Sequence, residues 1–202
     1  MMMNPIIQIL RNKHVIHTKE IVEAFEFVDR KDFVPSDQIH NVYGDYPLPI
    51  GHGQTNSQPY TVAFMLEHLN PAAGNQILDI GCGSGWTTAL LCNIVGNEGF
   101  ITGLERVDEL VDFASYNLEK YDFKNYTISK AGTHLGIPEK RFDRILVSAA
   151  ARELPKQLLE QLNVGGVMII PIVQSIWRIE KMSDSDYQTK KYPGFVFVPL
   201  VY

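Results

Sequence analysis

The sequence predicts an α/β fold with a mainly parallel sheet, an antiparallel edge strand and helices on both faces. Residues 76–80 form a short apolar run typical of a buried strand, and a glycine-rich turn and a helical stretch at 86–95 follow it. A second apolar stretch at 100–104 ends at an acidic residue. Strand and helix continue to alternate until two strands follow each other near the C-terminus, a pattern that indicates a parallel sheet with an antiparallel edge.

The N-terminal part is expected to be helical. Within residues 5–40, Thr18 can cap a helix with apolar residues at helical spacing. The prolines and glycines of residues 45–59 predict an ordered loop rather than helix or strand. Helical periodicity returns at 60–69. We therefore expect one domain over residues 1–202, with a helical cover and a loop in residues 1–70 and an α/β core in residues 75–202.

The core elements follow in order. Further helices are predicted at 110–121 and 154–162, and Gly165-Gly166 marks a turn before a strand at 167–172. Other strands are predicted at the following ranges: 126–129, 144–147, 175–181 and 195–200. A polar loop joins the last two of these strands.

Composition limits the classes of function. The chain has 202 residues, 45% of them hydrophobic, and its 18 basic and 23 acidic residues give a net charge of −5, which argues against general affinity for nucleic acid. No signal peptide is visible from Met1 to Pro5, and no apolar run is long enough to span a membrane. The only cysteines are Cys82 and Cys92, which fits a reducing cytoplasm and favours neither a disulfide nor a zinc site.

The glycine-rich turn is the first motif that indicates chemistry. Gly81, Gly83 and Gly85 form a G-x-G-x-G loop, with Asp79 two residues before it and Glu105 at the end of the next strand. A dinucleotide fingerprint would read G-x-G-x-x-G. The pattern instead resembles the S-adenosylmethionine loop of Rossmann-like class I methyltransferases, with Glu105 accepting hydrogen bonds from the ribose and Asp79 near the amino-acid end. The alternative is a glycine turn without a ligand.

The second motif lies in the loop at 43–60. Thr55 and Ser57 are one residue apart, so in an extended stretch both hydroxyls point the same way. Ser57 alone could instead cap the helix that follows, but that leaves the segment 47–54 unexplained.

Together these motifs resemble the protein-L-isoaspartate O-methyltransferases, nearly over the whole length. The resemblance rests mainly on the run P-L-P-I-G-x-G-Q-T-x-S-Q-P-Y at 47–60, on 22–35, on 78–88 and on Phe-Val-Pro-Leu at 197–200. It implies an enzyme that uses S-adenosyl-L-methionine, needs no metal and methylates the free carboxylate of L-isoaspartyl residues in damaged proteins. It implies Ser57 and Thr55 as the catalytic residues. The cofactor-binding residues that it implies are Gln54, Asp79, Gly81, Gly83, Ser84, Gly85, Glu105, Arg106, Gly132 and Thr133.

Two departures from the family pattern bear on the site. Asn56 stands where the family usually has an aliphatic residue, and its amide must find a partner because an unsatisfied buried amide costs about 1–3 kcal/mol. Ala131 stands where an aspartate is expected to hold the adenine amino group, and His134 is a possible substitute. Two alternatives therefore stay open, namely a non-catalytic or weakly active binding module and a methyltransferase of the same fold with another acceptor. We expect a monomer that binds isoaspartyl proteins and peptides.

Overall fold

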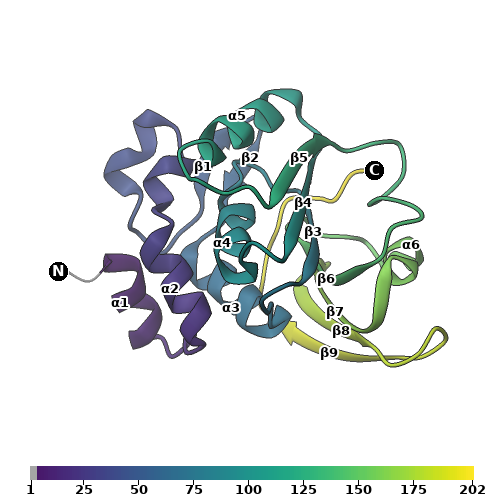
Figure 1. Ribbon diagram of the computed structural model, residues 1–202. Coiled ribbons are helices and arrows are strands. Elements are labelled where there is room, and N and C mark those ends of the chain that lie inside the picture. The colour runs from purple at the N-terminus through teal and green to yellow at the C-terminus, as the bar shows by residue number, and fades with distance from the viewer. Residues whose placement is uncertain (1–3) are drawn as a thin grey trace.

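The computed structural model describes residues 4–202, and a seven-stranded sheet forms its centre (Figure 1). The strand order is β5-β4-β3-β6-β7-β8-β9. The strands are β3 (Gln76–Ile80), β4 (Phe100–Glu105), β5 (Tyr126–Lys130), β6 (Phe142–Val147), β7 (Leu162–Ile172), β8 (Ser175–Lys181) and β9 (Tyr187–Pro193). The five strands from β5 to β7 pair in parallel, whereas β8 pairs antiparallel with both β7 and β9. The predicted parallel sheet with an antiparallel edge is confirmed.

Helices cover both faces of this sheet, but unequally. The helices are α1 (Pro5–Asn12), α2 (Lys19–Phe27), α3 (Pro59–Leu69), α4 (Trp86–Val95), α5 (Asp108–Leu118) and the short α6 (Lys156–Glu160), with 3-10 turns at Arg30–Phe33 and Ser36–Asn41. One hydrophobic cluster packs the four helices from α1 through α4, and the end of α5, against one face of the sheet. A second cluster on the other face contains α6 and residues of the 131–141 loop. Figure 1 shows α6 alone across the sheet from the other helices.

The order of the central strands indicates where on this sheet a ligand can bind. Ile77 and Leu78 are fully buried and contribute to different clusters, as expected of a strand covered on both faces. The chain runs outward from β3 through β4 to β5 and then returns to place β6 on the other side of β3. Open α/β sheets bind ligands at such a reversal, beyond the carboxyl ends of the strands.

The N-terminal helices begin as their sequences suggest, with one exception. Asn4 accepts a hydrogen bond from the Ile6 amide, and Pro5 occupies the first helical turn. Thr18 is the residue before α2, but its hydroxyl donates to the Glu67 carboxylate at 2.6 Å and makes no capping bond. The predicted capping role is therefore wrong, because a nearby carboxylate takes the hydroxyl. The prediction that no signal peptide is present rests partly on Met1 to Met3, which lie outside the described residues.

Four predictions about strands and turns are also wrong. Residues 45–59 contain a hairpin of β1 (Leu48–Gly51) and β2 (Gln54–Asn56), because Leu48 and Ile50 bury alternate side chains while positive φ angles at 51–53 close the turn. The predicted last strand at 195–200 is irregular, and the polar segment that forms β9 was expected to be a loop. An exposed edge strand needs no apolar alternation. The Gly165-Gly166 pair lies inside β7, next to an irregularity in its pairing with β6.

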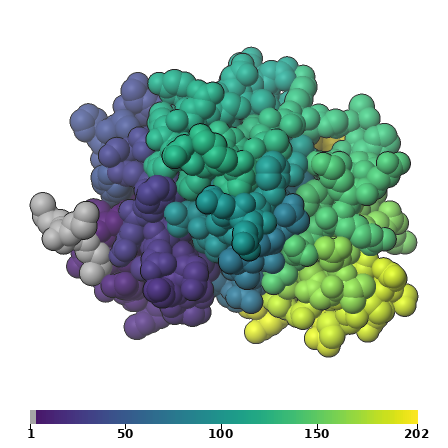
Figure 2. Space-filling model, viewed as in Figure 1, coloured from purple at the N-terminus to yellow at the C-terminus, as the bar shows by residue number. Residues whose placement is uncertain are grey.

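In the space-filling view the N-terminal helices and β9 lie at opposite ends of the molecule (Figure 2). Between them are the elements that carry the glycine loop and the strands that end at the crevice. Among the described residues, no helix is long and apolar enough to cross a membrane.

Candidate active site

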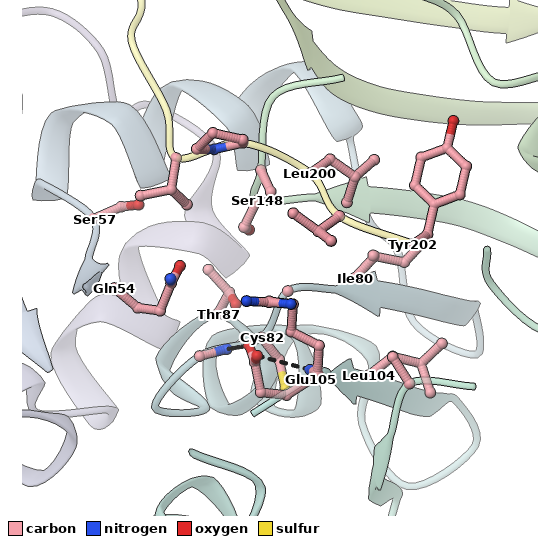
Figure 3. Close-up of a pocket in the computed structure, with 18 of the residues that line it drawn as sticks. Gln54, Ser57, Ile80, Cys82, Thr87, Leu104, Glu105, Ser148, Leu200 and Tyr202 are labelled. Atoms are coloured by element: carbon pink, nitrogen blue, oxygen red, sulfur yellow. Dashed lines mark hydrogen bonds between the residues drawn. The ribbon is translucent and has the colours of Figure 1, made fainter. Parts of the chain in front are cut away.

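A cavity of about 310 Å³ opens at the carboxyl ends of the central strands (Figure 3). Ile80 ends β3, Glu105 ends β4 and Ser148 follows β6, and all three line the cavity. In Figure 3, Leu200 and Tyr202 of the C-terminal segment lie across the cavity from Glu105. The predicted site residues that line this cavity are Gln54, Thr55, Ser57, Gly81, Gly83, Ser84, Glu105, Arg106 and Gly132.

The glycine loop has the backbone conformation that its sequence predicts. Gly81, Gly83 and Gly85 have φ angles of 73°, 55° and 87°, in the left-handed region that favours glycine. Gly81 and Gly83 line the cavity, but Gly85 does not. A Cβ atom at Gly85 would lie 3.2 Å from side-chain atoms of Ala114 and Leu118, so this glycine permits α5 to pack against the loop.

Glu105 organises the loop as well as facing the cavity. Its carboxylate is 5% exposed and accepts hydrogen bonds from the amides of Gly83 at 3.0 Å, Arg106 at 2.7 Å and Val107 at 3.1 Å. An ionised carboxylate offers about four lone-pair sites. The three amides leave one site, on Oε2, for a ligand hydroxyl. The glycine loop and the end of β4 are therefore joined into one rigid rim.

Asp79 lies beneath the cavity instead of on its wall. The side chain is fully buried, and its Oδ2 accepts from the hydroxyls of Thr87 at 2.8 Å and Thr88 at 2.7 Å, while Oδ1 has no partner within the described residues. Burial raises the pKa of the Asp79 carboxyl to about 6, although the two threonine hydroxyls oppose the shift. Asp79 thus braces the first turn of α4, and Thr87 from that turn lines the cavity.

The hairpin places Thr55 and Ser57 on a wall between two cavities. A second cavity of about 280 Å³ lies beside the first, and Thr55, Ser57, Ser148 and Val198 line both. The residue that precedes α3 is Gln58, with no side-chain capping bond, so the interpretation of Ser57 as a helix cap is wrong. Two hydroxyls at a shared wall can contact one molecule in each cavity.

Asn56, between these two residues, also lines the first cavity, but its side-chain amide bonds to Arg30 and Ser84 inside the protein. Its side chain is buried and has partners at both ends: Oδ1 accepts from Arg30 and Nδ2 donates to the Ser84 hydroxyl. The expectation that this amide has a partner is confirmed.

The end of β5 forms the far part of the cavity. Ala131, Gly132 and His134 line it, whereas Thr133 does not and instead has its hydroxyl 3.3 Å from His134 Nδ1. Among the described lining residues, Glu105 has the only side chain that carries a carboxylate. The remaining wall is mostly apolar and includes Ile80, Leu104, Leu135 and Leu200.

The sequence interpretation missed the part of the wall formed by residues 198–202, as well as Thr87 and Ser148. The Ala150 amide donates to the Val198 carbonyl, and the Leu200 amide donates to the Ala150 carbonyl, each at 2.8 Å. These bonds bring the C-terminal segment to the end of β6. The apolar run Phe-Val-Pro-Leu was the available signal, but as a predicted strand it was assigned to the sheet.

The whole chain, residues 1–202, matches the sequence model of the family described as protein-L-isoaspartate(D-aspartate) O-methyltransferase. The chain belongs to this family. A Methanopyrus kandleri protein-L-isoaspartate O-methyltransferase is 39% identical over 97% of this chain and 89% of its own length. The Staphylothermus marinus protein of that name is 40% identical over 97% of this chain and 92% of its own.

Solved structures agree with this assignment. A Plasmodium falciparum structure, described as a protein-L-isoaspartate O-methyltransferase in complex with S-adenosyl-L-homocysteine, superposes with a TM-score of 0.89 at 27% identity and 98% coverage of both chains. The fold of this chain is therefore the Rossmann-like class I methyltransferase fold.

Cys82 and Cys92 are both free and buried. In residues 4–202, no group of three histidine, cysteine or acidic side chains is placed to hold a metal ion.

Proposed function

We propose that this chain transfers a methyl group from S-adenosyl-L-methionine to the free α-carboxylate of L-isoaspartyl residues in damaged proteins. The observation that carries the proposal is the wall formed by Thr55 and Ser57, which separates two adjoining cavities in a member of this family. The cavity beside the glycine loop suits the cofactor. The cavity beside Phe197 and Val198 suits the peptide.

The residues of the first cavity fit S-adenosyl-L-methionine. The remaining acceptor site of Glu105 suits a ribose hydroxyl, and the positive-φ loop at Gly81 and Gly83 keeps side chains away from the amino-acid end. Leu104 and Leu135 offer apolar surface for the adenine. When bound, the cofactor supplies an electrophilic methyl group on a sulfonium.

The protein's contribution to the transfer is alignment. A terminal-type α-carboxyl has a pKa of about 3.5, so at pH 7 it is already an anionic nucleophile and needs no general base. In-line displacement requires the attacking oxygen within about 3 Å of the methyl carbon and collinear with the bond that breaks. Thr55 and Ser57 line both cavities, and we expect their hydroxyls to donate hydrogen bonds to the carboxylate and fix that geometry.

The chemistry after transfer needs no further group from the protein. The backbone nitrogen that follows the isoaspartyl residue attacks the ester carbonyl, which releases methanol and closes a succinimide. Water then opens the ring at either carbonyl, which returns part of the material to normal aspartate. Repeated cycles repair the backbone.

The decisive experiment measures binding and turnover together. Calorimetric titration with S-adenosylmethionine should show binding, and a peptide with one isoaspartyl residue should be methylated while its aspartyl counterpart is not. Cofactor binding without turnover on any acceptor would support the binding module. Turnover only on another acceptor would support a different methyltransferase.

We further propose that residues 1–70 and 75–202 work as one domain in a cytoplasmic monomer that does not bind nucleic acid. The shared cluster of α1 to α4 and the net charge of −5 support these proposals. Sedimentation equilibrium and a nucleic-acid titration test them, and a dimer or a saturable complex would contradict them.

A further inference from the structure

Arg30 is a fully buried cation at the centre of the hairpin that carries Ser57. Its guanidinium donates to the carbonyls of Val42, Gly44, Tyr46, Asn56 and Ser57 at 2.9–3.3 Å and to Asn56 Oδ1 at 2.8 Å. All these acceptors are neutral and belong to residues 42–57. One side chain therefore fixes the backbone of the whole segment.

This arrangement is stable because the acceptors satisfy the guanidinium. Burial lowers the pKa of Arg30 to about 10, which leaves the group charged at pH 7. A buried charge is tolerated when it is fully hydrogen-bonded. The guanidinium carbon also lies 5.2 Å from the ring centroid of Trp86, a contact of the cation–π type. Trp86 lines the cofactor cavity.

Asn56 connects the buried Arg30 side chain to the glycine loop. Its Oδ1 accepts from Arg30 Nε at 2.8 Å, and its Nδ2 donates to Ser84 Oγ at 3.2 Å. The Ser84 carbonyl in turn accepts from Asn117 Nδ2 of α5 at 3.1 Å. A continuous buried chain of hydrogen bonds thus joins the hairpin, the glycine loop and α5. Leucine has nearly the same shape as asparagine but can make neither bond, so an aliphatic residue at position 56 breaks this chain.

We propose that Asn56 is a positioning residue that couples occupancy of the cofactor cavity to the placement of Thr55 and Ser57. Ser84 lines the cofactor cavity, and Asn56 lies between the two hydroxyl residues in β2. A ligand that orders the glycine loop at Ser84 therefore also orders the peptide-facing hydroxyls. This inference rests on the proposed function, because it takes the isoaspartyl carboxylate as the group that those hydroxyls meet.

The test measures coupling, which a purely structural residue would leave unchanged. The Kd of a non-methylated isoaspartyl peptide is measured with and without saturating S-adenosylhomocysteine, and the ratio of the two is the coupling factor. For the wild type we expect a factor in the ordinary range of about 5 to 150. Asn56→Leu and Ser84→Ala should each reduce it to below about 2, and the double variant should lose no more than either single change.

Two further variants make the result specific. Asn56→Asp keeps an oxygen for Arg30 and a second for the Ser84 hydroxyl to donate to, so it should restore most of the coupling. Asn163→Leu removes a part-buried asparagine whose partner is Asp143, outside the network, and should keep the wild-type factor. Thermal unfolding of each variant reports on its stability.

Wild-type coupling in both Asn56→Leu and Ser84→Ala, or a factor of about 1 in the wild type, would overturn the inference. Should Asn56→Leu fail to fold, Ser84→Ala and Asn56→Asp still decide it. If the wild type binds the cofactor product but no isoaspartyl peptide under any condition, the proposed function itself fails and the inference falls with it.

Discussion

The end of β5 gives the sharpest prediction about cofactor affinity. Ala131 stands where the family resemblance places an adenine-binding aspartate, and the structure puts Ala131 and Gly132 on the cavity wall. The Ala131 amide donates to the Glu105 carbonyl at 2.7 Å, so its backbone is fixed beside the residue that faces the ribose. An aspartate at 131 should therefore supply the missing acceptor for the adenine amino group.

The expected gain follows from one regained hydrogen bond. Such a bond contributes about 1.5 kcal/mol, which corresponds to roughly tenfold tighter binding. Ala131→Asp is compared with Gly132→Asp, because the sequence leaves the register open by one residue. The second variant is sterically feasible: a Cβ atom at Gly132 meets nothing within 4 Å, and the φ angle of Gly132 is not in the left-handed region.

Calorimetry with S-adenosylhomocysteine measures the gain, and its inosine analogue is the matched control. The analogue carries oxygen in place of the adenine amino group, so an added carboxylate should not tighten its binding. If neither variant binds S-adenosylhomocysteine more tightly, or if both ligands gain equally, the adenine is held by other groups and the reasoning is refuted.

Three other predictions follow from the site. Glu105→Ala should weaken S-adenosylhomocysteine binding by tenfold or more, since about 1.5–3 kcal/mol is lost with a hydrogen bond to a charged group. Gly83→Val should weaken it similarly, because the valine side chain would occupy space at the cavity wall that the ligand needs; calorimetry with unchanged affinity in both would refute the assignment. Ser57→Ala should lower kcat/KM for an isoaspartyl peptide with little change in cofactor affinity, and a normal kcat/KM would move the role to Thr55. The folded-state pKa of Asp79 of about 6 exceeds its unfolded value of about 3.9, so ionised Asp79 destabilises the fold above pH 6, and stability relative to Asp79→Asn should rise as pH falls from 7 to 4. Urea unfolding across that range checks the sign, and a constant difference would contradict it.

Much of the core could be predicted because its elements have strong local signals. Helix 86–95 and strand 175–181 have the predicted boundaries. β9 could not be found, because its residues are exposed and polar and form a strand only by pairing with β8. The hairpin was hidden by prolines and glycines that are compatible with a loop. In both cases pairing with another segment decides the structure, and local propensity does not show it.

The sequence predicts which residues belong to the site better than it predicts what each of them does there. Of the cofactor residues expected from the resemblance, Asp79, Gly85 and Thr133 do not line the cavity; their part in binding stays a prediction. The three amides on Glu105 depend on how β4 meets the glycine loop in space. Arg30 fixes the segment that ends at Ser57, but the sequence does not indicate this role. A lone arginine in a helical region is usually a surface residue.

The cavity wall combines residues 54–57, 62, 80–84, 86–87, 104–106, 131–132, 134–136, 148–149 and 198–202. Long-range contacts of this kind form late in folding, because each requires closing a long loop of chain. No fragment that lacks residues 198–202 has the complete wall. Methyl transfer is therefore a reporter of global folding: it should appear only when the last segment has docked on the end of β6, and it should disappear at the first local opening of that segment.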